Sequence, residues 1–483
     1  MVPAHLRFGG GAAASTIHPL VAIYLLIAVV LILTLPRGKA IVPFLVAFFT
    51  IPIGQVVVLG GLHFTALRVL ILAGLARRAS FRKSSAEGKY PGGFNGVDWV
   101  VVLWSVSAVI AFCFEFRAMQ AFVDALGVLV DTLGGYLVVR FLVPDGEAMR
   151  RTIKVLAATC VINGVCMINE QISHMNVFGL LGGISREVTI REGHIRSAGV
   201  MGCLYAGTFA GVLIPVFLWL WTEGKSRMAA LAGLAGATAM VITSYSSTSL
   251  LAYAGSLVGL AFWPLRKQMH LIRWGFVMML VGLQLVMKAP VWALIARVDL
   301  TGSSSSYQRY QLVDMCIRHF SDWWLLGTAS YTTWGWDTWD LCNQFVAVAL
   351  TGGLLTLIFY IAIFKRSFGA IGTTRKLVNG DREQEWLLWC LGAALFAVVV
   401  SSFGINYVPQ LLMGLFPLLA CISMATFEAR QVAVPSVEAP SHERFASAPG
   451  AVAAYLPING ATQEVWHAFS AGTRARFRSW LKS

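Results

Sequence analysis

Two polar stretches in an otherwise apolar chain concentrate arginine. The stretch ISREVTIREGHIRSAGV contains Arg186, Arg191 and Arg196 at intervals of five residues, and SSYQRYQLVDMCIRHF contains Arg309 and Arg318. A guanidinium group binds phosphate oxygens through two parallel donors, with a geometry that lysine does not offer. The residue type and its recurrence therefore predict a site for an anionic, phosphorylated substrate.

The alternative is that these arginines neutralise charges that have nothing to do with a substrate. The partners available for such pairing are lipid headgroups and the nearby acids Glu187, Glu192 and Asp314. Spacing along the chain does not separate the two interpretations, because it gives no distance between side chains.

Acids and bases in the two loops that contain these stretches, over 170–197 and 288–343, supply a second kind of chemistry. A glycosyl transfer from a diphosphate leaving group needs a base near the acceptor hydroxyl and cations on the departing phosphate. No metal site or other cofactor is expected, because the histidines are too scattered for metal-ligand spacing. Asp-x-Asp, P-loop and Rossmann glycine motifs do not occur, so nucleotide-sugar chemistry has no support. The acids and bases are Glu170, His174, Glu187, Glu192, His194, Asp299, Asp314, His319, Asp322, Asp337 and Asp340.

Residues 303–320 are predicted to form an amphipathic helix. Ser303 to Ser306 offer N-caps, and Tyr307, Tyr310, Val313 and Ile317 then fall on one face. A dense group of tryptophans follows, which is typical of the aromatic belt at a membrane surface. The alternative is a platform on which pyranose rings stack. These residues are Trp323, Trp324, Trp334, Trp336 and Trp339.

The elements that position these side chains are expected to be membrane helices. Hydrophobic residues make up 57% of the chain and charged residues 12%, about half the roughly 25% of a soluble domain. Apolar runs of about 20 residues recur, the length that crosses a bilayer. We therefore expect an all-α integral membrane protein of about 12–13 transmembrane helices. The apolar segments are 18–35, 41–60, 62–76, 98–114, 120–143, 153–169, 198–221, 228–245, 248–264, 271–287, 344–364, 386–402 and 409–427.

The second and third segments form the least regular pair. Pro43 and Pro52 interrupt the second, and the third is short and carries Arg68. Two continuous helices are one interpretation, and a re-entrant pair is the other.

Lysine and arginine are distributed unevenly between alternate loops. The richer set is predicted to be cytoplasmic, and thirteen spans then place the N-terminus outside and the C-terminus inside. Most cations of the poorer, outer set lie in two long loops, over 170–197 and 288–343. The outer set consists of Arg7, Arg117, Arg186, Arg191, Arg196, Lys288, Arg297, Arg309 and Arg318.

A single transmembrane domain is predicted over residues 1–427. Residues 428–483 are Pro/Ala/Ser-rich and end in a basic segment, which indicates a mostly disordered cytoplasmic tail. The net charge of +14 lies in short loops, where it orients helices and meets anionic lipids. No basic patch indicates nucleic-acid binding. Cys316 and Cys342 share the second long loop, so a disulfide between them is one alternative.

Three stretches within residues 190–365 resemble the O-antigen ligase/O-antigen polymerase superfamily. Arg196-Ser-Ala-Gly199 before an apolar segment is similar to the family's Arg-x-x-Gly. Ser306-Tyr-Gln-Arg309, followed by a helix and by Trp324-Leu-Leu-Gly327, is similar to the family's arginine, amphipathic helix and glycine turn. Asp340-Leu-Cys-Asn343-Gln-Phe345 before Thr351-Gly-Gly-Leu354 is similar to its His-Asn run and the following glycine.

Two departures from the family pattern bear on catalysis. Cys342 stands where the family has a histidine, so the resemblance leaves the general base to Asp340 or His319. Ser246-Ser-Thr-Ser249 matches a Ser-Arg pair without supplying the arginine. The resemblance implies a metal-independent transfer in a GT-C-like architecture. It also implies that Arg196 and Arg309 hold the lipid diphosphate, with Arg191, Arg318 and Asn343 as further binding residues.

The function that the resemblance implies is polymerisation of polyprenyl-diphosphate-linked repeat units into exopolysaccharide or O-antigen. It places the chain in the bacterial inner membrane, with a periplasmic active site and with a chain-length regulator and export proteins as expected partners. One alternative is a ligase that transfers finished glycan to lipid A core or protein. A second alternative is a lipid-linked glycan flippase, whose translocation path would need charged residues within the spans. The charged residues available there are Arg68, Arg140, Asp124 and Asp131. A third alternative is a structural or scaffold role.

Overall fold

The computed structural model of the chain describes residues 15–433, apart from residues 61, 82–89, 298–304, 336–337 and 339. The predicted disordered tail begins at 428, but helix α16 (Pro409–Ala433) continues to Ala433. The remainder of the tail lies outside the described residues, as do Ser303, Ser304, Asp299, Asp337, Trp336 and Trp339.

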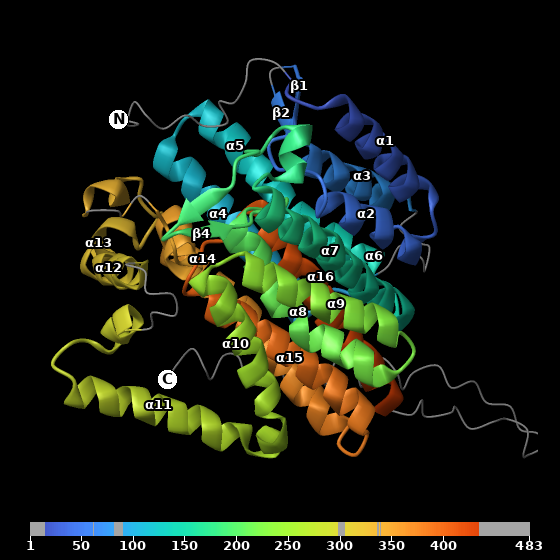
Figure 1. Ribbon diagram of the computed structural model, residues 1–483. Helices are drawn as coiled ribbons and strands as arrows, with labels where there is room; N and C mark the ends of the chain where they lie inside the picture. Colours follow the sequence, from blue (N-terminus) through green and yellow to red (C-terminus); the bar gives the residue numbers. More distant parts are fainter. Residues whose placement is uncertain are drawn as a thin grey trace, which may run out of the picture. The chain divides into compact units, whose positions relative to one another are not determined.

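The described part of the chain is a multi-pass, all-α membrane protein by the length and composition of its helices (Figure 1). Eight of its helical segments are long and apolar enough to cross a bilayer, and three apolar helices are shorter. The eight comprise α4 (Gly96–Phe116), α5 (Met119–Leu129) with η3 (Val130–Gly134) and α6 (Gly135–Leu142), α7 (Gly146–Ser173), α8 (Cys203–Glu223), η5 (Trp263–Gln268) with α11 (Met269–Val286), α14 (Gln344–Leu377), α15 (Arg382–Ser402) and α16. The shorter three are α1 (Pro19–Thr34), α9 (Arg227–Thr243) and α10 (Ser247–Ala261).

Residues 41–60 do not form a continuous helix, which was one of the two interpretations of this segment. Helix α2 (Ile41–Phe48) is followed by the antiparallel hairpin β1 (Val56–Leu59) and β2 (Leu62–Thr65), and then by α3 (Ala66–Ser80). Proline at position 52 disfavours helix for the residue before it and lacks an N–H. Two side chains satisfy carbonyls that a helix would have used: Asn163 Nδ2 donates to Phe49 O and Gln410 Nε2 to Ile51 O, both at 3.1 Å. This is one reason why the structure has fewer long apolar helices than the predicted 12–13.

Close approach of backbones holds the central helices together. Gly233 of α9 faces Ala157 of α7, and a Cβ at Gly164 of α7 would lie 2.8 Å from the Gly236 carbonyl oxygen. Small residues at helix interfaces let van der Waals packing and short contacts replace the hydrophobic effect, which is weak between helices in lipid. Close packing at a small residue also joins α8 to α10, where Gly211 lies against the Ser249 carbonyl and Ala252.

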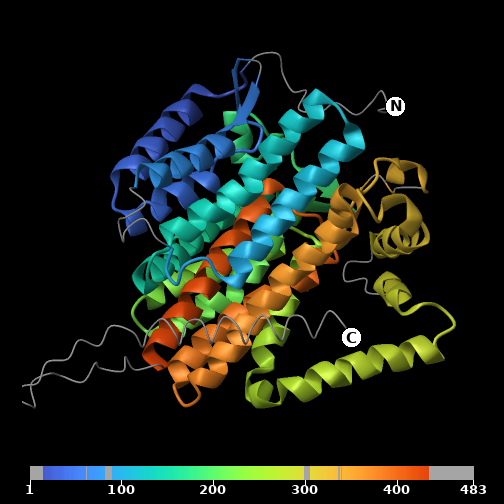
Figure 2. The same ribbon diagram turned by 180° about the vertical axis from the view of Figure 1, so that it is seen from behind.

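Helix α11 stands apart from the other helices (Figures 1 and 2). None of its residues is buried, although its sequence is apolar. An apolar helix without a packed face is stable where lipid solvates it on all sides. It leads through η6 (Val291–Arg297) into α12 (Ser305–Arg318) and α13 (Phe320–Trp323).

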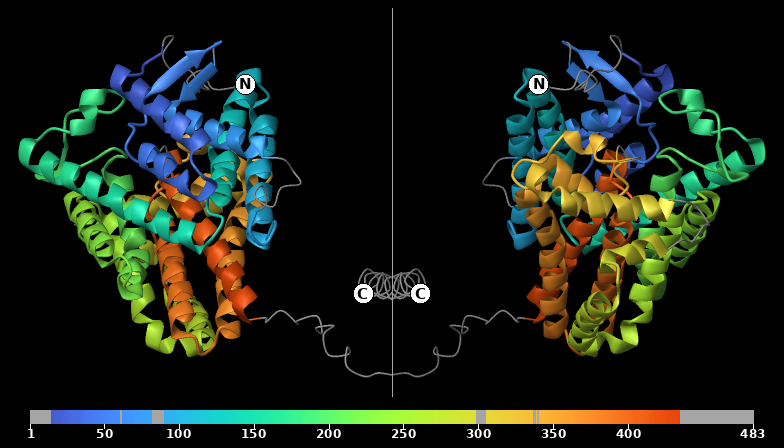
Figure 3. Two further views of the ribbon diagram at one scale, coloured as in Figure 1. Left: turned by 90° about the vertical axis from the view of Figure 1, so that its right-hand side faces the viewer. Right: turned by 90° about the vertical axis from the view of Figure 1, so that its left-hand side faces the viewer.

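The polar loops gather at one end of the bundle, where α8, α10, α14 and α16 begin. We call it the loop end. It carries the β1–β2 hairpin, η4 (Val177–Leu181), the hairpin of β3 (Thr189–Arg191) and β4 (His194–Arg196), α12, α13 and η7 (Ser330–Thr333). The turn between α14 and α15 lies at the opposite end (Figures 1 and 3).

Candidate functional site

The turn between α9 and α10 brings the two predicted clamp arginines into one region. The backbone N–H of Ser197, next to Arg196, donates to Thr243 O at 3.0 Å. Arg309 of α12 donates from Nη2 to Thr248 Oγ1 at 3.1 Å. Residues that lie far apart in the sequence therefore converge on the same short turn at the loop end.

A buried polar network fixes the backbone around Arg196. Gln171 Nε2 donates to Ile195 O, Ser197 Oγ and Thr243 O, each at 2.9 Å. The Glu170 carboxylate accepts from the N–H groups of Ala198 and Gly199 at 2.9 and 3.1 Å. Gly199 has a φ of +54°, which explains the glycine of the Arg-x-x-Gly stretch. No sequence pattern indicated a role for Gln171, because only the folded chain places it beside β4.

Among the residues that the structure describes, Arg196 has no counter-ion. Arg196 is 8% exposed, and its buried Nε has no hydrogen-bond partner among the described residues. Within the described residues, no ion pair includes its guanidinium. A buried charge without a partner is costly, so this arrangement is the one expected of a cation that awaits an external anion.

Arg191 and Arg318 fit the alternative interpretation, in which arginines pair with neighbouring acids. Arg191 lies 3.6 Å from Glu192, and Arg318 lies 2.7 Å from Asp314. Their side chains are 43% and 67% exposed. The structure thus separates the four arginines predicted to bind substrate into two buried ones at the turn and two exposed ones with acidic partners.

Arg309, Cys342 and Asp340 form the other side of the site. Burial raises the pKa of the Cys342 thiol to about 11, the nearby Arg309 charge opposes that shift, and Asp340 adds to it. Both charges therefore act on the thiol at short range. Asp340 and Arg309 therefore both lie near Cys342.

Asn343, predicted to bind substrate, caps α14. Its Oδ1 accepts from the N–H groups of Phe345 and Val346 at 2.9 and 3.2 Å, and the residue is 1% exposed. The carbonyl oxygen is therefore engaged in the cap, which leaves the Nδ2 group as its remaining donor.

Helix N-termini add positive potential at the same place. Helix α10 begins next to Ser246. Ser246 and Ser249 are buried, and their hydroxyls have no hydrogen-bond partner in the part of the chain that the structure describes. Gly207 in the first turn of α8 faces the Ser249 and Ser244 hydroxyls. Peptide dipoles and unpaired N–H groups at helix starts favour anions, so this turn and the two buried arginines form an electropositive, donor-rich surface.

His319 lies away from this surface. It follows α12 ten residues after Arg309, which is about 15 Å along a helix. Its Nδ1 lies 3.0 Å from Asp322 Oδ2, and its ring stacks on Trp334 with centroids 4.5 Å apart. Asp340, the other residue predicted to be catalytic, lies near Cys342, as Arg309 does.

Two of the sequence stretches of the predicted core lock together. The N–H of Thr328 donates to Leu350 O and the N–H of Leu354 to Trp324 O, both at 2.8 Å. Helix α14 is broken at Gly353, with φ +75°, and Gly327 has φ +87°. A Cβ at either glycine would strike the facing backbone. The lock holds the segment that carries Arg309 against the start of α14.

The predicted disulfide alternative is not formed. Cys316 and Cys342 are both free, and both contact the small apolar cluster that contains Leu312, Trp323 and Leu350. Burial raises the pKa of Cys316 to about 12.

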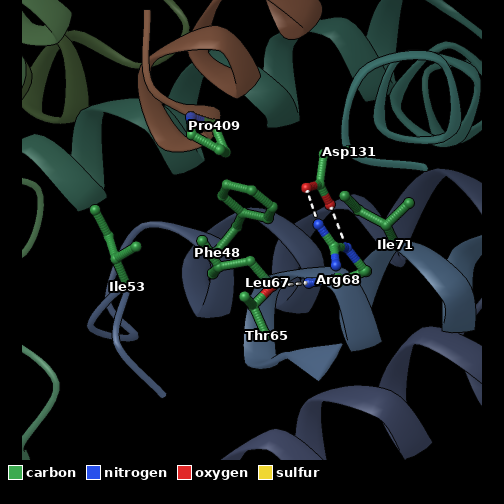
Figure 4. Close-up of a pocket in the computed structure, with 8 residues that line it drawn as sticks. All are labelled: Phe48, Ile53, Thr65, Leu67, Arg68, Ile71, Asp131 and Pro409. Atoms are coloured by element: carbon green, nitrogen blue, oxygen red, sulfur yellow. Dashed lines mark hydrogen bonds and ion pairs between the residues drawn. The ribbon is translucent and has the colours of Figure 1, made fainter. Parts of the chain in front are cut away.

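A separate cavity of about 130 Å³ is lined by Arg68 and Asp131, two of the charged residues predicted within the spans (Figure 4). Arg68 and Asp131 form a two-contact ion pair there, at 2.6 Å from Nη2 and 3.0 Å from Nε. Asp131 lies in the π-helical turn η3. Phe48, Ile53, Thr65, Leu67, Ile71 and Pro409 complete the lining. Arg140 pairs elsewhere with Asp98 at 3.4 Å, so both arginines predicted inside spans have aspartate partners.

No protein-family model matches the chain, and no curated protein sequence matches it significantly.

Proposed function

We propose that the chain is a membrane glycosyltransferase that polymerises polyprenyl-diphosphate-linked oligosaccharide repeat units into exopolysaccharide or O-antigen. The observation that carries the proposal is the buried Arg196, which has no counter-ion within the described part of the chain, next to a turn that also binds Arg309. Two arginines, buried serine hydroxyls and a helix N-terminus match the charge and oxygens of a diphosphate.

In the proposed reaction, a hydroxyl of one glycan attacks the anomeric carbon of another. The new C–O bond forms as the bond from that carbon to the diphosphate oxygen breaks, and the electron pair leaves with the diphosphate. Asp340 accepts the hydroxyl proton, and Arg196 and Arg309 stabilise the charge that develops on the leaving phosphate. These side chains supply all the charges that the step requires.

The proposed location is the bacterial inner membrane, with the loop end in the periplasm. The Lys and Arg distribution of the loops supports this orientation, with a periplasmic N-terminus and a cytoplasmic C-terminus. The expected ligand is the lipid-linked glycan itself, within membrane lipids. A chain-length regulator and export proteins are the expected protein partners.

The test is an assay with purified protein in nanodiscs and lipid-linked repeat units extracted from producing cells. Chain growth and release of polyprenyl diphosphate are expected. Arg196→Ala and Arg309→Ala should lower the rate by a factor on the order of 10² to 10⁴, whereas the exposed Arg318→Ala should stay within a few-fold of the wild type. A wild type that neither extends chains nor releases lipid diphosphate contradicts the proposal.

A ligase that moves a finished glycan onto lipid A core or protein uses the same donor and the same leaving group. Deletion of the gene separates the two reactions. A polymerase deletion leaves single repeat units, and a ligase deletion leaves long chains that are not attached to an acceptor.

A lipid-linked glycan flippase is the second candidate, and the cavity at Arg68 and Asp131 favours it. The ion pair lies beside the short helix α2 and the π-helical turn, and charged groups next to broken helices are typical of translocation paths. Transport of the lipid-linked glycan in proteoliposomes that depends on Arg68 and not on Arg196 would establish this function in place of polymerisation.

A further inference from the structure

Tyr245 and His194 form an exposed aromatic pair at the edge of the candidate site. Their rings are stacked, with centroids 4.0 Å apart and planes inclined by 21°. Tyr245 is 41% exposed, and His194 is exposed as well. One ring supports the other, so the tyrosine is held in place while part of its surface faces solvent.

The backbone at Tyr245 is held in an unusual conformation. Its φ is +42°, in the left-handed region that residues other than glycine rarely adopt. Such strained residues persist where the surrounding structure imposes them, and they cluster at functional sites. Here the hydrogen bonds at Thr243 and Thr248 hold the two ends of the turn. The Tyr245 side chain lies between these ends and is partly exposed.

The position of the pair ties it to the proposed diphosphate clamp. Tyr245 lies in the turn whose ends bond Ser197 and Arg309. His194 and Arg196 are two residues apart in β4, so their side chains leave the strand on the same face. The stacked rings therefore lie on the face of the hairpin that also carries Arg196.

We propose that the Tyr245–His194 pair is the subsite for the sugar ring bonded directly to the lipid diphosphate. This inference rests on the proposed function, and it adds the part of the ligand that lies beyond the phosphates. The apolar face of a pyranose ring packs on the tyrosine ring, and the imidazole offers a polar edge to its hydroxyls. A diphosphate held by Arg196 would place its first sugar next to these rings.

The test compares the binding of two ligands to the full-length protein in nanodiscs, measured by thermal shift. The ligands are lipid-linked repeat units and polyprenyl diphosphate without a sugar. The variants are Tyr245→Phe, which keeps the ring, and Tyr245→Asn and Tyr245→Gly, which tolerate a positive φ and remove the ring. Tyr307→Asn, on the exposed surface of α12, is the matched control.

The wild type, Tyr245→Phe and Tyr307→Asn should bind the lipid-linked glycan more tightly than the sugar-free lipid. Tyr245→Asn and Tyr245→Gly should lose about three- to tenfold of that preference, the size of a stacking contact, with unchanged affinity for the sugar-free lipid. A preference that survives both ring deletions, or that the wild type lacks, overturns the subsite. The binding measurement does not require turnover. If the wild type prefers the lipid-linked glycan and loses this preference without the Tyr245 ring, but does not polymerise it, the polymerase proposal is contradicted and the subsite is not.

Discussion

At the residue scale, arginines with the same sequence context have different surroundings. Arg191 and Arg196 stand at opposite ends of one small hairpin, yet Arg191 is exposed beside Glu192, and Arg196 is buried without an acid. The family resemblance implied the clamp role for Arg196 and a further binding role for Arg191, but the sequence pattern did not indicate that their surroundings would differ. That distinction arises from Gln171 and Glu170 of α7, which hold the end of β4 and the residues after it inside the protein.

The two candidate bases are separable by mutation. Asp340→Asn removes a carboxylate close to Arg309 and Cys342, so a rate loss of 10²-fold or more is expected, in the range of general base catalysis. His319→Asn, at the exposed end of α12, should retain most of the activity. Turnover of lipid-linked repeat units by the purified variants is the measurement. The opposite order of losses would assign the base to the His319–Asp322 pair.

The Cys342 thiol gives a pH-dependent readout of the same surroundings. Its pKa lies at about 11 against an ordinary value of 9.0, because burial disfavours the thiolate. Iodoacetamide labelling of Cys342, followed by mass spectrometry, should therefore accelerate about tenfold per pH unit through pH 9 and level off only near 11. Because the folded state holds this proton more tightly, the associated stabilisation is complete below about pH 9 and is lost as the pH rises towards 11.

The labelling curve has an internal control. Arg309 lowers the Cys342 pKa against the effect of burial, so Arg309→Gln should move the curve to higher pH. A rate that levels off below pH 9 would show that Cys342 is not in the buried surroundings described here.

At the element scale, the break in α14 sets the position of the Arg309-bearing segment. Periodicity predicted a helix over 344–364, and one forms, but the left-handed Gly353 within it was beyond prediction. Its conformation depends on Trp324 and Thr328, which bond the carbonyl and N–H groups that the break releases. The sequence analysis identified the stretches around Gly327 and Gly353 separately. It did not predict that the two stretches pair with each other.

Gly353→Ala tests the break. The new Cβ would lie 2.5 Å from Leu325 O at a φ of +75°, so a loss of about 2 kcal/mol or more in the free energy of unfolding is expected. Gly369→Ala in the same helix meets no atom within 4 Å and should be neutral or stabilising by about 0.5–1 kcal/mol. Unfolding midpoints in detergent measure both, and equal midpoints would contradict the lock.

Composition and apolar periodicity predicted the membrane-helix class and most segments at the scale of the whole molecule. They failed over 41–60, where Pro52 and the donors Asn163 and Gln410 stabilise a non-helical path that no local pattern encodes. Within the candidate site, Arg196, Arg309 and Asp340 were singled out by residue type and resemblance. The turn at Tyr245 and Thr248 was not, since it acquires its role only from the helices that meet there.

The central claim is that Arg196 and Arg309 together bind a lipid diphosphate. The most direct measurement is the dissociation constant of polyprenyl diphosphate for the purified protein and for the variants Arg196→Ala, Arg309→Ala and Arg318→Ala. Loss of either buried arginine should weaken binding about tenfold to 10²-fold, the effect of 1.5–3 kcal/mol for a charge-assisted hydrogen bond, and Arg318→Ala should bind like the wild type. Equal dissociation constants for the wild type, Arg196→Ala and Arg309→Ala would contradict the account.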